Sequence, residues 1–435
     1  MGGKAILLVV VGFGIIFLTM GLNLNCSATR AVTNATDFYE NNVAHDIAVS
    51  GANFAANQIF LDPTWTDGYS NMDYQGGEFD VSVNIVNSFK NIRRIISTGT
   101  FDGHTATVKI TLQPSKFSKF GYYSVTEPKG IWWTTGDTVW GPFHTQDYLR
   151  ISGDPVFMGK TTTKYGIQYD PVSKNIGNNP EFNGGYEQGV DLPMPPSGVT
   201  DIAAAAAKGG IKITGQSVVY LTFNGNNITY QYGNNGQPTT VPASQFAPNG
   251  VIYVEGADVR LKGTITGQYT IATSSVTKTV TTGGGGRRGR GRGRTKTITQ
   301  GGNVYLDGDV TYSSNPLTNP NSTDMLGIVA ENNVYITDNS QNNNNINIDA
   351  AIYCQNGSFT AENYNKRPVS GTINLLGGIT QNTRGAVGTF SINHHAGINI
   401  VSGFNKSYRY DERLMFSSPP AYPNTGSFEI VSWYE

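Results

Sequence analysis

An uncharged apolar stretch at the N-terminus constrains this chain more than any other feature. The run AILLVVVGFGIIFLTMGLNL, from Ala5 to Leu24, holds twenty residues without a charged side chain. At about 1.5 Å per residue, a helix of this length spans roughly 30 Å, the thickness of one hydrocarbon core. A cleaved signal peptide has a shorter apolar region and a small-residue cleavage site, which are not found here. The sequence therefore predicts a transmembrane helix, and Lys4 before the span favours an N-inside, body-outside orientation.

The helical pattern continues beyond the apolar stretch. Apolar residues at helical spacing form one stripe and alanines form another beside it: Val43, Ile47 and Phe54, and Ala44, Ala48 and Ala55. Asp62-Pro63 ends the pattern, because the residue before a proline disfavours helix. We expect a helix of about fifty residues, half in lipid and half outside. Its small residues would pack closely against a sheet or against other such helices.

Three segments with alternating apolar and polar residues follow the helix. They read GEFDVSVNIV, IRRIISTGTF and HTATVKITLQ, and Asp102-Gly103 separates the last two. Alternation with period two is typical of half-buried strands, and Asp-Gly favours a tight hairpin turn. The sequence predicts an antiparallel β-meander after the helix.

A long N-terminal helix before an antiparallel sheet resembles a type IV pilin, specifically the larger minor pilins. The resemblance rests on Gly2-Gly3 before the apolar span, the span itself, IAVSGANFAANQI, and ISTGTFDGHTATVKITL, and it covers about the first 120 residues. It implies cleavage by a prepilin peptidase after Gly2 or Gly3. It also implies contacts with other pilin-like subunits through the N-terminal helix.

Two features depart from the pilin pattern. Lys4 follows the glycines instead of preceding them, and the fifth mature position would be Leu7 or Leu8 in place of the usual Glu. In pilins that Glu is thought to neutralise the amino terminus of the neighbouring subunit. A buried unpaired carboxylate is costly, so a subunit without a neighbour above it can lack the Glu. The departure fits a tip or priming subunit and fits equally a membrane protein outside any fibre.

The middle of the chain is similar to a family of uncharacterised bacterial envelope proteins that join a pilin-like start to a β-rich body. The resemblance rests on IWWTTGDTVWGPFHTQDYLRISGDPVFMGKTTT and on the closing PPAYPNTGSFEIVSWYE, and it implies architecture without a defined chemistry. Strand-like core residues are expected within the first segment: Val139, Phe143, Leu149, Ile151 and Phe157.

Three polar residues in this segment suggest a hydrolase or metal site. They are Asp137, His144 and Asp147, and no GxSxG, HExxH or paired-carboxylate motif accompanies them. The favoured interpretation is structural: His144 caps a turn and the aspartates form Asx-turns.

From about residue 199 onward, short apolar segments recur at roughly 20 to 25 residue intervals after one short helix, DIAAAAAKGG. The pattern predicts a stacked solenoid, most simply a right-handed parallel β-helix. Ile352 is expected to point inward, and Asn332-Asn333 to adopt left-handed bends. Asp307-Gly308-Asp309 resembles a calcium motif, but we expect a hairpin or rung turn.

An arginine-glycine segment, GGGGRRGRGRGR at 283–294, interrupts this pattern between VTKTV and TKTI, which resemble the arms of a ribbon. The stretch from Lys278 to Lys296 holds seven basic residues and no acid. Candidate polyanion contacts are Arg287, Arg288, Arg290, Arg292, Arg294 and Lys296. Such side chains can fork onto phosphates or anionic glycan, but aromatic residues for base stacking are missing. Three interpretations of the segment remain: a solvated loop, a polyanion contact and a DNA-uptake element.

Composition limits the classes of partner and site. Only 14% of residues are charged and the formal net charge is −1, so the whole chain is not an electrostatic partner for DNA or anionic lipid. Cys26 and Cys354 belong to no zinc or thioredoxin motif, and no metal or cofactor is expected. A polysaccharide-degrading β-helix needs convergent charged side chains. The charged rung residues form no evident repeated column: Glu255, Asp258, Arg260, Asp307, Asp309, Asp324, Glu331, Asp349, Glu362 and Arg384.

The sequence thus predicts a mainly β protein with four segments. They are a transmembrane and extended helix at 1–62, a pilin-like β-meander at 63–125, a β-rich connecting region at 126–198, and a β-helix-like domain at 199–435 with the arginine-glycine loop at 278–296. We expect a non-catalytic pilin-like protein of the bacterial inner membrane, with its body in the periplasm or at the cell surface. The alternatives are a β-helix that binds or degrades polysaccharide, and a contact with anionic glycan or DNA through the loop.

Overall fold

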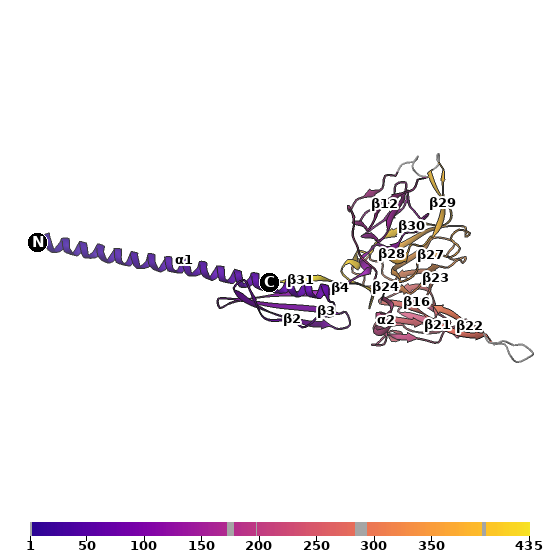
Figure 1. The fold of residues 1–435 in the computed structure, drawn as a ribbon, viewed down its shortest axis with the longest axis horizontal. Helices are drawn as coiled ribbons and strands as arrows, with labels where there is room; N and C mark the ends of the chain where they lie inside the picture. The colour runs from indigo at the N-terminus through magenta and orange to yellow at the C-terminus, as the bar shows by residue number, and fades with distance from the viewer. Residues whose placement is uncertain (1, 172–177, 197, 283–293, 394–396) are drawn as a thin grey trace, which may run out of the picture. The chain divides into compact units, whose positions relative to one another are not determined.

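The computed structural model describes residues 2–171, 178–196, 198–282, 294–393 and 397–435. The chain divides into two compact units, of which the first is Met1–Pro114 with Gly426–Glu435 and the second is Ser115–Thr425. Figure 1 labels the elements of both units. The finer division into four segments stays a prediction.

The first unit begins with one long helix, α1 (Gly2–Leu61), of 60 residues. It ends immediately before Asp62, whose carboxylate accepts a hydrogen bond from the Thr64 backbone nitrogen at 2.8 Å. The predicted end at Asp62-Pro63 is therefore confirmed, and the helix is longer than the expected fifty residues. By its length and composition, it is long and apolar enough to cross a membrane.

The two halves of α1 differ in what surrounds them within this unit. Large apolar side chains from Ile6 to Leu24 are all at least 51% exposed. Nearer the end of the helix, a continuous stripe of small and branched side chains is fully buried against the sheet: Ala44, Ile47, Ala48, Ala52, Ala55 and Ile59. Phe54, which was expected on the apolar stripe, is 45% exposed and stacks on Phe79 at the edge of the interface.

Glycine and alanine bring the helix and the sheet into close contact. A Cβ atom on Gly99 would lie 2.3 Å from the Ala44 carbonyl oxygen and 2.5 Å from the Ala48 nitrogen. A Cβ on Gly51 of the helix would lie 2.6 Å from the Ser97 Oγ. The expected packing of the small-residue stripe against a sheet is thus confirmed. At Gly99 the sheet backbone lies against the helix backbone, and at Gly51 the helix backbone lies against side chains of the sheet.

The sheet of the first unit is antiparallel, with the strand order β1-β2-β3-β4-β31. Its strands are β1 (Tyr69–Tyr74), β2 (Gly77–Asn87), β3 (Ile92–Phe101), β4 (His104–Lys116) and β31 (Asn424–Tyr434). The three predicted segments correspond to β2, β3 and β4. Asp102 and Gly103 form the turn with φ angles of 47° and 87°, the left-handed conformation that an Asp-Gly hairpin requires. The sequence did not predict β1, which is polar, or the return of the chain end as β31.

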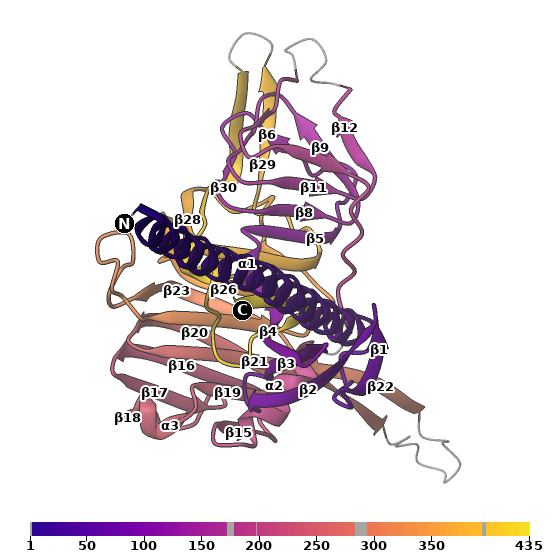
Figure 2. The same ribbon diagram turned by 90° about the vertical axis from the view of Figure 1, so that its left-hand side faces the viewer.

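The second unit is built on ladders of parallel strands. The first ladder places ten strands side by side: β15 (Ile211–Ile213), β19 (Val251–Glu255), β21 (Gln268–Thr282), β24 (Met325–Ala330), β26 (Ile346–Cys354), β28 (Val369–Thr383), β5 (Tyr122–Thr126), β8 (Phe143–Thr145), β11 (Thr161–Thr163) and β14 (Tyr186–Gln188). Figure 2 shows part of this stack, where β5, β8 and β11 lie one above another.

Further parallel ladders complete the unit. A second ladder joins β16 (Val218–Gly225), β20 (Asp258–Ile265), β23 (Val304–Tyr312), β25 (Val334–Ile336) and β27 (Phe359–Ala361). A third continues from β28 through β30 (Gly397–Arg409), β7 (Thr138–Val139), β10 (Val156–Phe157) and β13 (Glu181–Phe182). A fourth joins β6 (Trp133–Thr134), β9 (Tyr148–Ser152) and β12 (Gly166–Tyr169).

A few elements depart from the parallel pattern. Antiparallel strands pair locally in three places: β17 (Asn227–Tyr232) with β16 and β18 (Thr239–Pro242), β22 (Arg294–Gly301) with β21, and β29 (Gly388–Asn393) with β30. The short helices are α2 (Gly198–Ala206), which begins before the predicted DIAAAAAKGG helix and covers its first six residues, and α3 (Ala243–Phe246). There are also 3-10 turns at Phe117–Lys119 and Glu412–Met415.

The order of strands in space differs from their order in the chain. Ile379 of β28 pairs with Tyr122 of β5, so an early segment continues the stack where a late one ends. The segment from 126 to 198 is rich in β-strands. These strands extend the ladders and share one hydrophobic core with the later strands. The core residues predicted in this segment are confirmed, because each is at most 1% exposed: Val139, Phe143, Leu149, Ile151 and Phe157. Ile352 is fully buried, as predicted.

Two expectations about turns in this unit are wrong. Asn332 and Asn333 do not have positive φ angles. Their side chains hydrogen-bond along the stack instead, with the Asn303 Oδ1 accepting from the Asn333 backbone nitrogen and the Asn333 Oδ1 from the Ser358 nitrogen at 2.9 Å. Asp307-Gly308-Asp309 lies inside β23, at a shift in its register with β20, and does not form a hairpin turn. Asparagine is common in turns for two reasons: it tolerates a left-handed backbone, and its side-chain amide hydrogen-bonds to backbone groups. The second reason applies here, so the presence of asparagine did not predict a left-handed bend.

The fold class is thus confirmed in its coarser features. The chain is mostly β, with a long apolar N-terminal helix, an antiparallel N-terminal sheet, and a large mixed sheet that is mainly parallel.

Candidate functional site

The predicted arginine-glycine site is only partly within the described residues. Arg287, Arg288, Arg290 and Arg292 lie outside them, whereas Arg294 begins β22 and Lys296 is exposed. The flanking arms form the predicted antiparallel ribbon, with pairs from Ser275↔Gly301 to Thr282↔Arg294. The ribbon is confirmed, and polyanion binding stays a prediction.

The predicted cleavage positions occupy the start of α1. Gly2 and Gly3 belong to its first turn, and Gly3 is exposed. Nothing lies within 4 Å of a Cβ atom built on Gly3. Processing at this position stays a prediction.

Asp137, His144 and Asp147 do not form a common site. His144 does not cap a turn as expected but lies buried in β8, where its Nδ1 is 2.8 Å from the Thr162 hydroxyl and its ring stacks on Tyr123. Burial lowers the pKa of His144 to about 4, so the ring is neutral at physiological pH. Asp147 accepts from the Tyr148 backbone nitrogen at 2.7 Å and from the Glu127 nitrogen at 3.0 Å, which is a structural role in a turn.

The charged rung residues mostly hold the stack together. Arg260 forms a bidentate pair with Asp307, with nitrogen–oxygen distances of 2.8 and 2.6 Å. Glu331 accepts from the Ser275 backbone nitrogen at 2.6 Å and Asp349 from the Tyr312 nitrogen at 2.9 Å. These bonds join one level of the stack to another. A structural role is therefore sufficient to explain why these charged residues are present.

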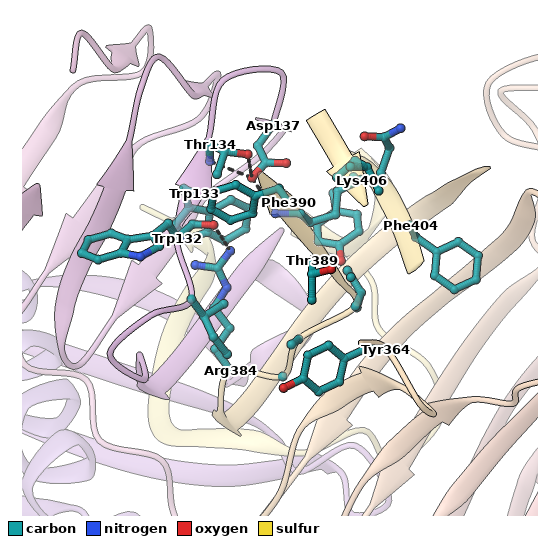
Figure 3. Close-up of a pocket in the computed structure, with 18 of the residues that line it drawn as sticks. Trp132, Trp133, Thr134, Asp137, Tyr364, Arg384, Thr389, Phe390, Phe404 and Lys406 are labelled. Atoms are coloured by element: carbon teal, nitrogen blue, oxygen red, sulfur yellow. Dashed lines mark hydrogen bonds and ion pairs between the residues drawn. The ribbon is translucent and has the colours of Figure 1, made fainter. Parts of the chain in front are cut away.

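A cavity of about 890 Å³ in the second unit is the strongest candidate site. Most of its lining comes from parts of the chain that are far apart in sequence, namely residues 130–137 around β6 and residues 384–390 and 400–408 around β29 and β30. Figure 3 shows their side chains gathered around it, with Trp132 at one edge and Phe404 at the opposite edge. Its volume lies within the range of roughly 300–1,000 Å³ that is typical of small-ligand sites.

Two buried ion pairs neutralise the cations of the cavity. Arg384 donates to the Glu127 carboxylate at 3.0 Å, and Lys406 lies 2.5 Å from the Asp137 carboxylate. Burial lowers the pKa of Lys406, and Asp137 offsets only part of this effect. Burial alone would also lower the pKa of Arg384, but Glu127 more than offsets it, so that pKa is raised. Both cations are thus held by carboxylates within the protein.

Aromatic rings form much of the remaining wall. Trp133 is 1% exposed, with the Arg384 guanidinium 4.0 Å and the Lys406 ammonium 5.1 Å from its ring centre. Its indole Nε1 has no hydrogen-bond partner among the described residues, although a buried donor normally has one. Trp132 is half-buried, and Tyr364 is 37% exposed. The cavity therefore combines open aromatic surface with an unused buried donor.

The sequence did not reveal this cavity. Asp137 of the cavity was considered as part of a hydrolase or metal site with His144 and Asp147, which the structure does not bring together with it. Trp132 and Trp133 were noted only as part of a resemblance, and Arg384 was grouped with the charged rung residues. A run of two tryptophans beside TTGD is the one local signal. Its partners Arg384 and Lys406 come from the far end of the chain, so no spacing rule could join them.

The first unit holds one cluster with metal-ligand chemistry. Asp37 and Glu40 of α1 and His104 of β4 place one ligand atom each within 4.8 Å of one another. His104 Nε2 is 3.0 Å from the Glu40 carboxylate, and this ion pair by itself accounts for the approach. The sequence did not suggest the cluster because His104 reaches the helix only through the β-meander.

Comparisons with known proteins find matches among solved structures only. No protein-family model matches the chain, and no curated protein matches it. The chain is similar to the crystal structure of the competence-associated pilin ComZ from Thermus thermophilus, which it matches over 90% of its own length and 96% of that chain, at 12% identity and a TM-score of 0.36. Because this TM-score is low, the likeness to type IV pilins rests on features of the chain itself: a long apolar N-terminal helix packed on an antiparallel sheet.

Proposed function

We propose that this chain is a membrane-anchored, pilin-like envelope protein that displays a large β body outside the membrane. It would serve without catalysis as a minor subunit in surface assembly, adhesion or secretion. One observation carries the proposal: the apolar first part of α1 is exposed within its unit, while the last part is buried on the sheet. A helix divided in this way can insert its apolar end into lipid while its other end remains part of a folded domain.

We also infer that the second unit is a right-handed parallel β-helix. Its long parallel ladders join segments one turn of the chain apart, as in β19, β21 and β24, and inward side chains from all levels share one core. Parallel connections are right-handed in the great majority of proteins. A solenoid suits display because its ladders build a long rigid surface from short repeated segments.

Contacts with other subunits would run through the exposed part of α1. Leu7 and Leu8 offer no carboxylate there to neutralise a neighbouring amino terminus. This supports a position at a tip or at the start of an assembly, where no subunit lies above. It supports equally a protein that stays in the bacterial inner membrane.

Mass spectrometry of the N-terminus of the native protein tests the pilin pathway. We expect a processed chain that begins at Gly3 or Lys4 and carries an N-methyl group. A native chain that keeps Met1 would overturn the pilin assignment and leave an ordinary membrane anchor.

The arginine-glycine segment supports a second candidate function, a contact with DNA or anionic glycan. The ribbon of β21 and β22 carries the segment, and its described side chains Lys278 and Lys296 are exposed. Phosphate binding by several arginines releases counterions and is therefore steeply salt-dependent.

Replacing Arg287, Arg288, Arg290, Arg292 and Arg294 by Ser tests this candidate. We expect folding to be unchanged and binding to a DNA duplex to be lost. Wild-type binding should also weaken steeply between low and physiological salt. Equal binding by both proteins, or binding indifferent to salt, would show that the segment is solvated surface only. A large loss of stability would show that the arginines pair inside the structure.

A further inference from the structure

We propose that the cavity lined by residues 130–137, 384–390 and 400–408 binds a short neutral oligosaccharide. This inference deepens the proposed function by naming the class of ligand that the displayed body contacts, and it rests on that function only for its biological setting. The binding itself depends on side chains of the second unit alone.

The charges of the cavity select a neutral ligand. Its two cations, Arg384 and Lys406, are already paired with Glu127 and Asp137 at 3.0 and 2.5 Å. Asp170, the other carboxylate besides Asp137 that lines the cavity, is 6% exposed and accepts from the Ser152 hydroxyl at 3.0 Å. An anionic ligand would find no free cation among the described lining residues and would have to break a buried ion pair.

The same arrangement disfavours a cationic ligand. A ligand cation is best held over the face of a tryptophan, within about 6 Å of the ring. The Trp133 ring already has Arg384 at 4.0 Å and Lys406 at 5.1 Å from its centre. A third cation there would be repelled by both.

The wall also has the mixed chemistry that a sugar ring requires. A pyranose has apolar C–H faces, which stack on aromatic rings, and a rim of hydroxyl groups, which need hydrogen-bond partners. Trp132, Tyr364 and Phe390 supply partly exposed aromatic surface, as Figure 3 shows around the cavity. Thr389 and Asn405 supply polar atoms to the same wall.

Trp133 lines the cavity and also belongs to the hydrophobic core, where its ring packs against Tyr122, Phe143 and Phe157. Its ring is 1% exposed and its Nε1 has no partner among the described residues, whereas a purely structural buried tryptophan usually satisfies this donor. A hydroxyl oxygen of a bound sugar is a suitable acceptor for it. A purely hydrocarbon ligand would leave the donor unsatisfied and lose that hydrogen bond.

The test measures sugar binding to the full chain, purified in a detergent without a sugar headgroup. Cellotetraose, maltotetraose and chitotetraose are the neutral probes, and tetragalacturonate is the matched anionic probe. Calorimetry and tryptophan fluorescence report binding. We expect at least one neutral tetraose to bind with a Kd below about 1 mM and tetragalacturonate to bind more weakly.

Two variants locate the binding, and a third variant serves as a matched control. Trp132→Ala should weaken binding at least about tenfold, and Tyr364→Ala, at an exposed position, should also weaken it. Trp140→Ala should leave the Kd within about twofold, because Trp140 is 46% exposed and does not line the cavity. Thermal melting checks that each variant folds. If Trp132→Ala does not fold, the Kd of Tyr364→Ala decides whether the cavity binds the sugar.

Three results would overturn the inference. They are no binding of any neutral tetraose at about 10 mM, binding unchanged by the cavity variants, and tighter binding of tetragalacturonate than of the neutral probes. None of these depends on membrane topology or N-terminal processing, so this inference and the proposed function fail separately.

Discussion

Arg384 and Glu127 form the most completely buried ion pair in the described part of the chain, with side chains 4% and 0% exposed. Removing two charges from water is costly, and the cost is recovered only where further hydrogen bonds satisfy both groups. The Glu127 carboxylate meets this condition, because it also accepts from the hydroxyls of Tyr122 at 2.7 Å and Ser124 at 2.6 Å. Glu127 thus organises the wall behind the candidate ligand site.

Replacing Glu127 by Gln should destabilise the protein strongly. The change keeps the shape but leaves the Arg384 guanidinium buried without a counter-charge, which typically costs about 3–5 kcal/mol. Urea unfolding of the full chain measures the loss. Glu187→Gln is the control, because its pair with Lys160 is exposed at 62% and 52% and should matter by less than about 1 kcal/mol. Similar effects of the two changes would contradict the buried-pair account.

His144 should make stability depend on pH. Its folded pKa is lowered to about 4 by burial, from an ordinary value of 6.5. The folded state therefore favours the neutral ring, and this stability is present above about pH 6.5 and lost as the pH falls toward 4. Relative to His144→Asn, the wild-type free energy of unfolding should drop by up to about 3 kcal/mol across this window. Parallel pH profiles for the two proteins would show that His144 is not buried as described.

At the scale of elements, the contact of α1 with its sheet depends on residues that lack bulk. Gly99 of β3 faces the helix backbone so closely that even a methyl group has no room. A strand glycine at such a point marks close approach of another backbone. The helix is thereby fixed to the sheet over its last turns, which keeps the apolar end available for the membrane.

Gly99→Ala should weaken this contact. A Cβ atom 2.3 Å from the Ala44 carbonyl oxygen forces the helix away from the sheet, and overpacking of this kind costs about 1–3 kcal/mol or more. Hydrogen exchange of β3 and of the last turns of α1 should accelerate. Gly21→Ala in the same helix meets nothing within 4 Å and should leave exchange unchanged. Unchanged exchange in Gly99→Ala would refute the close contact.

Local pattern predicted the elements better than their partners. Alternation located β2, β3 and β4, and the alanine stripe predicted the buried face of α1. Strands of two or three residues, such as β6, are too short to show any period. The pairing of β28 with β5, and the cavity built from Trp133 and Arg384, join residues far apart in the chain. No local spacing encodes these contacts, because they arise only when the ladders stack.

At the scale of the whole molecule, the chain joins a helix suited to lipid with two β-rich units. An apolar helix exposed over one hydrocarbon thickness is a liability in water and is explained by insertion into a membrane. The account therefore depends most on which side of the membrane the second unit occupies.

Cysteine labelling in intact spheroplasts measures this directly. With Cys26 replaced by Ser and Cys354 buried, single cysteines at two exposed positions, Lys4→Cys and Lys208→Cys, report on opposite sides of the span. A membrane-impermeant maleimide should label Lys208→Cys in intact spheroplasts and Lys4→Cys only after lysis. If Lys208→Cys is protected until lysis while Lys4→Cys is labelled from outside, the body faces the cytoplasm and the account is contradicted.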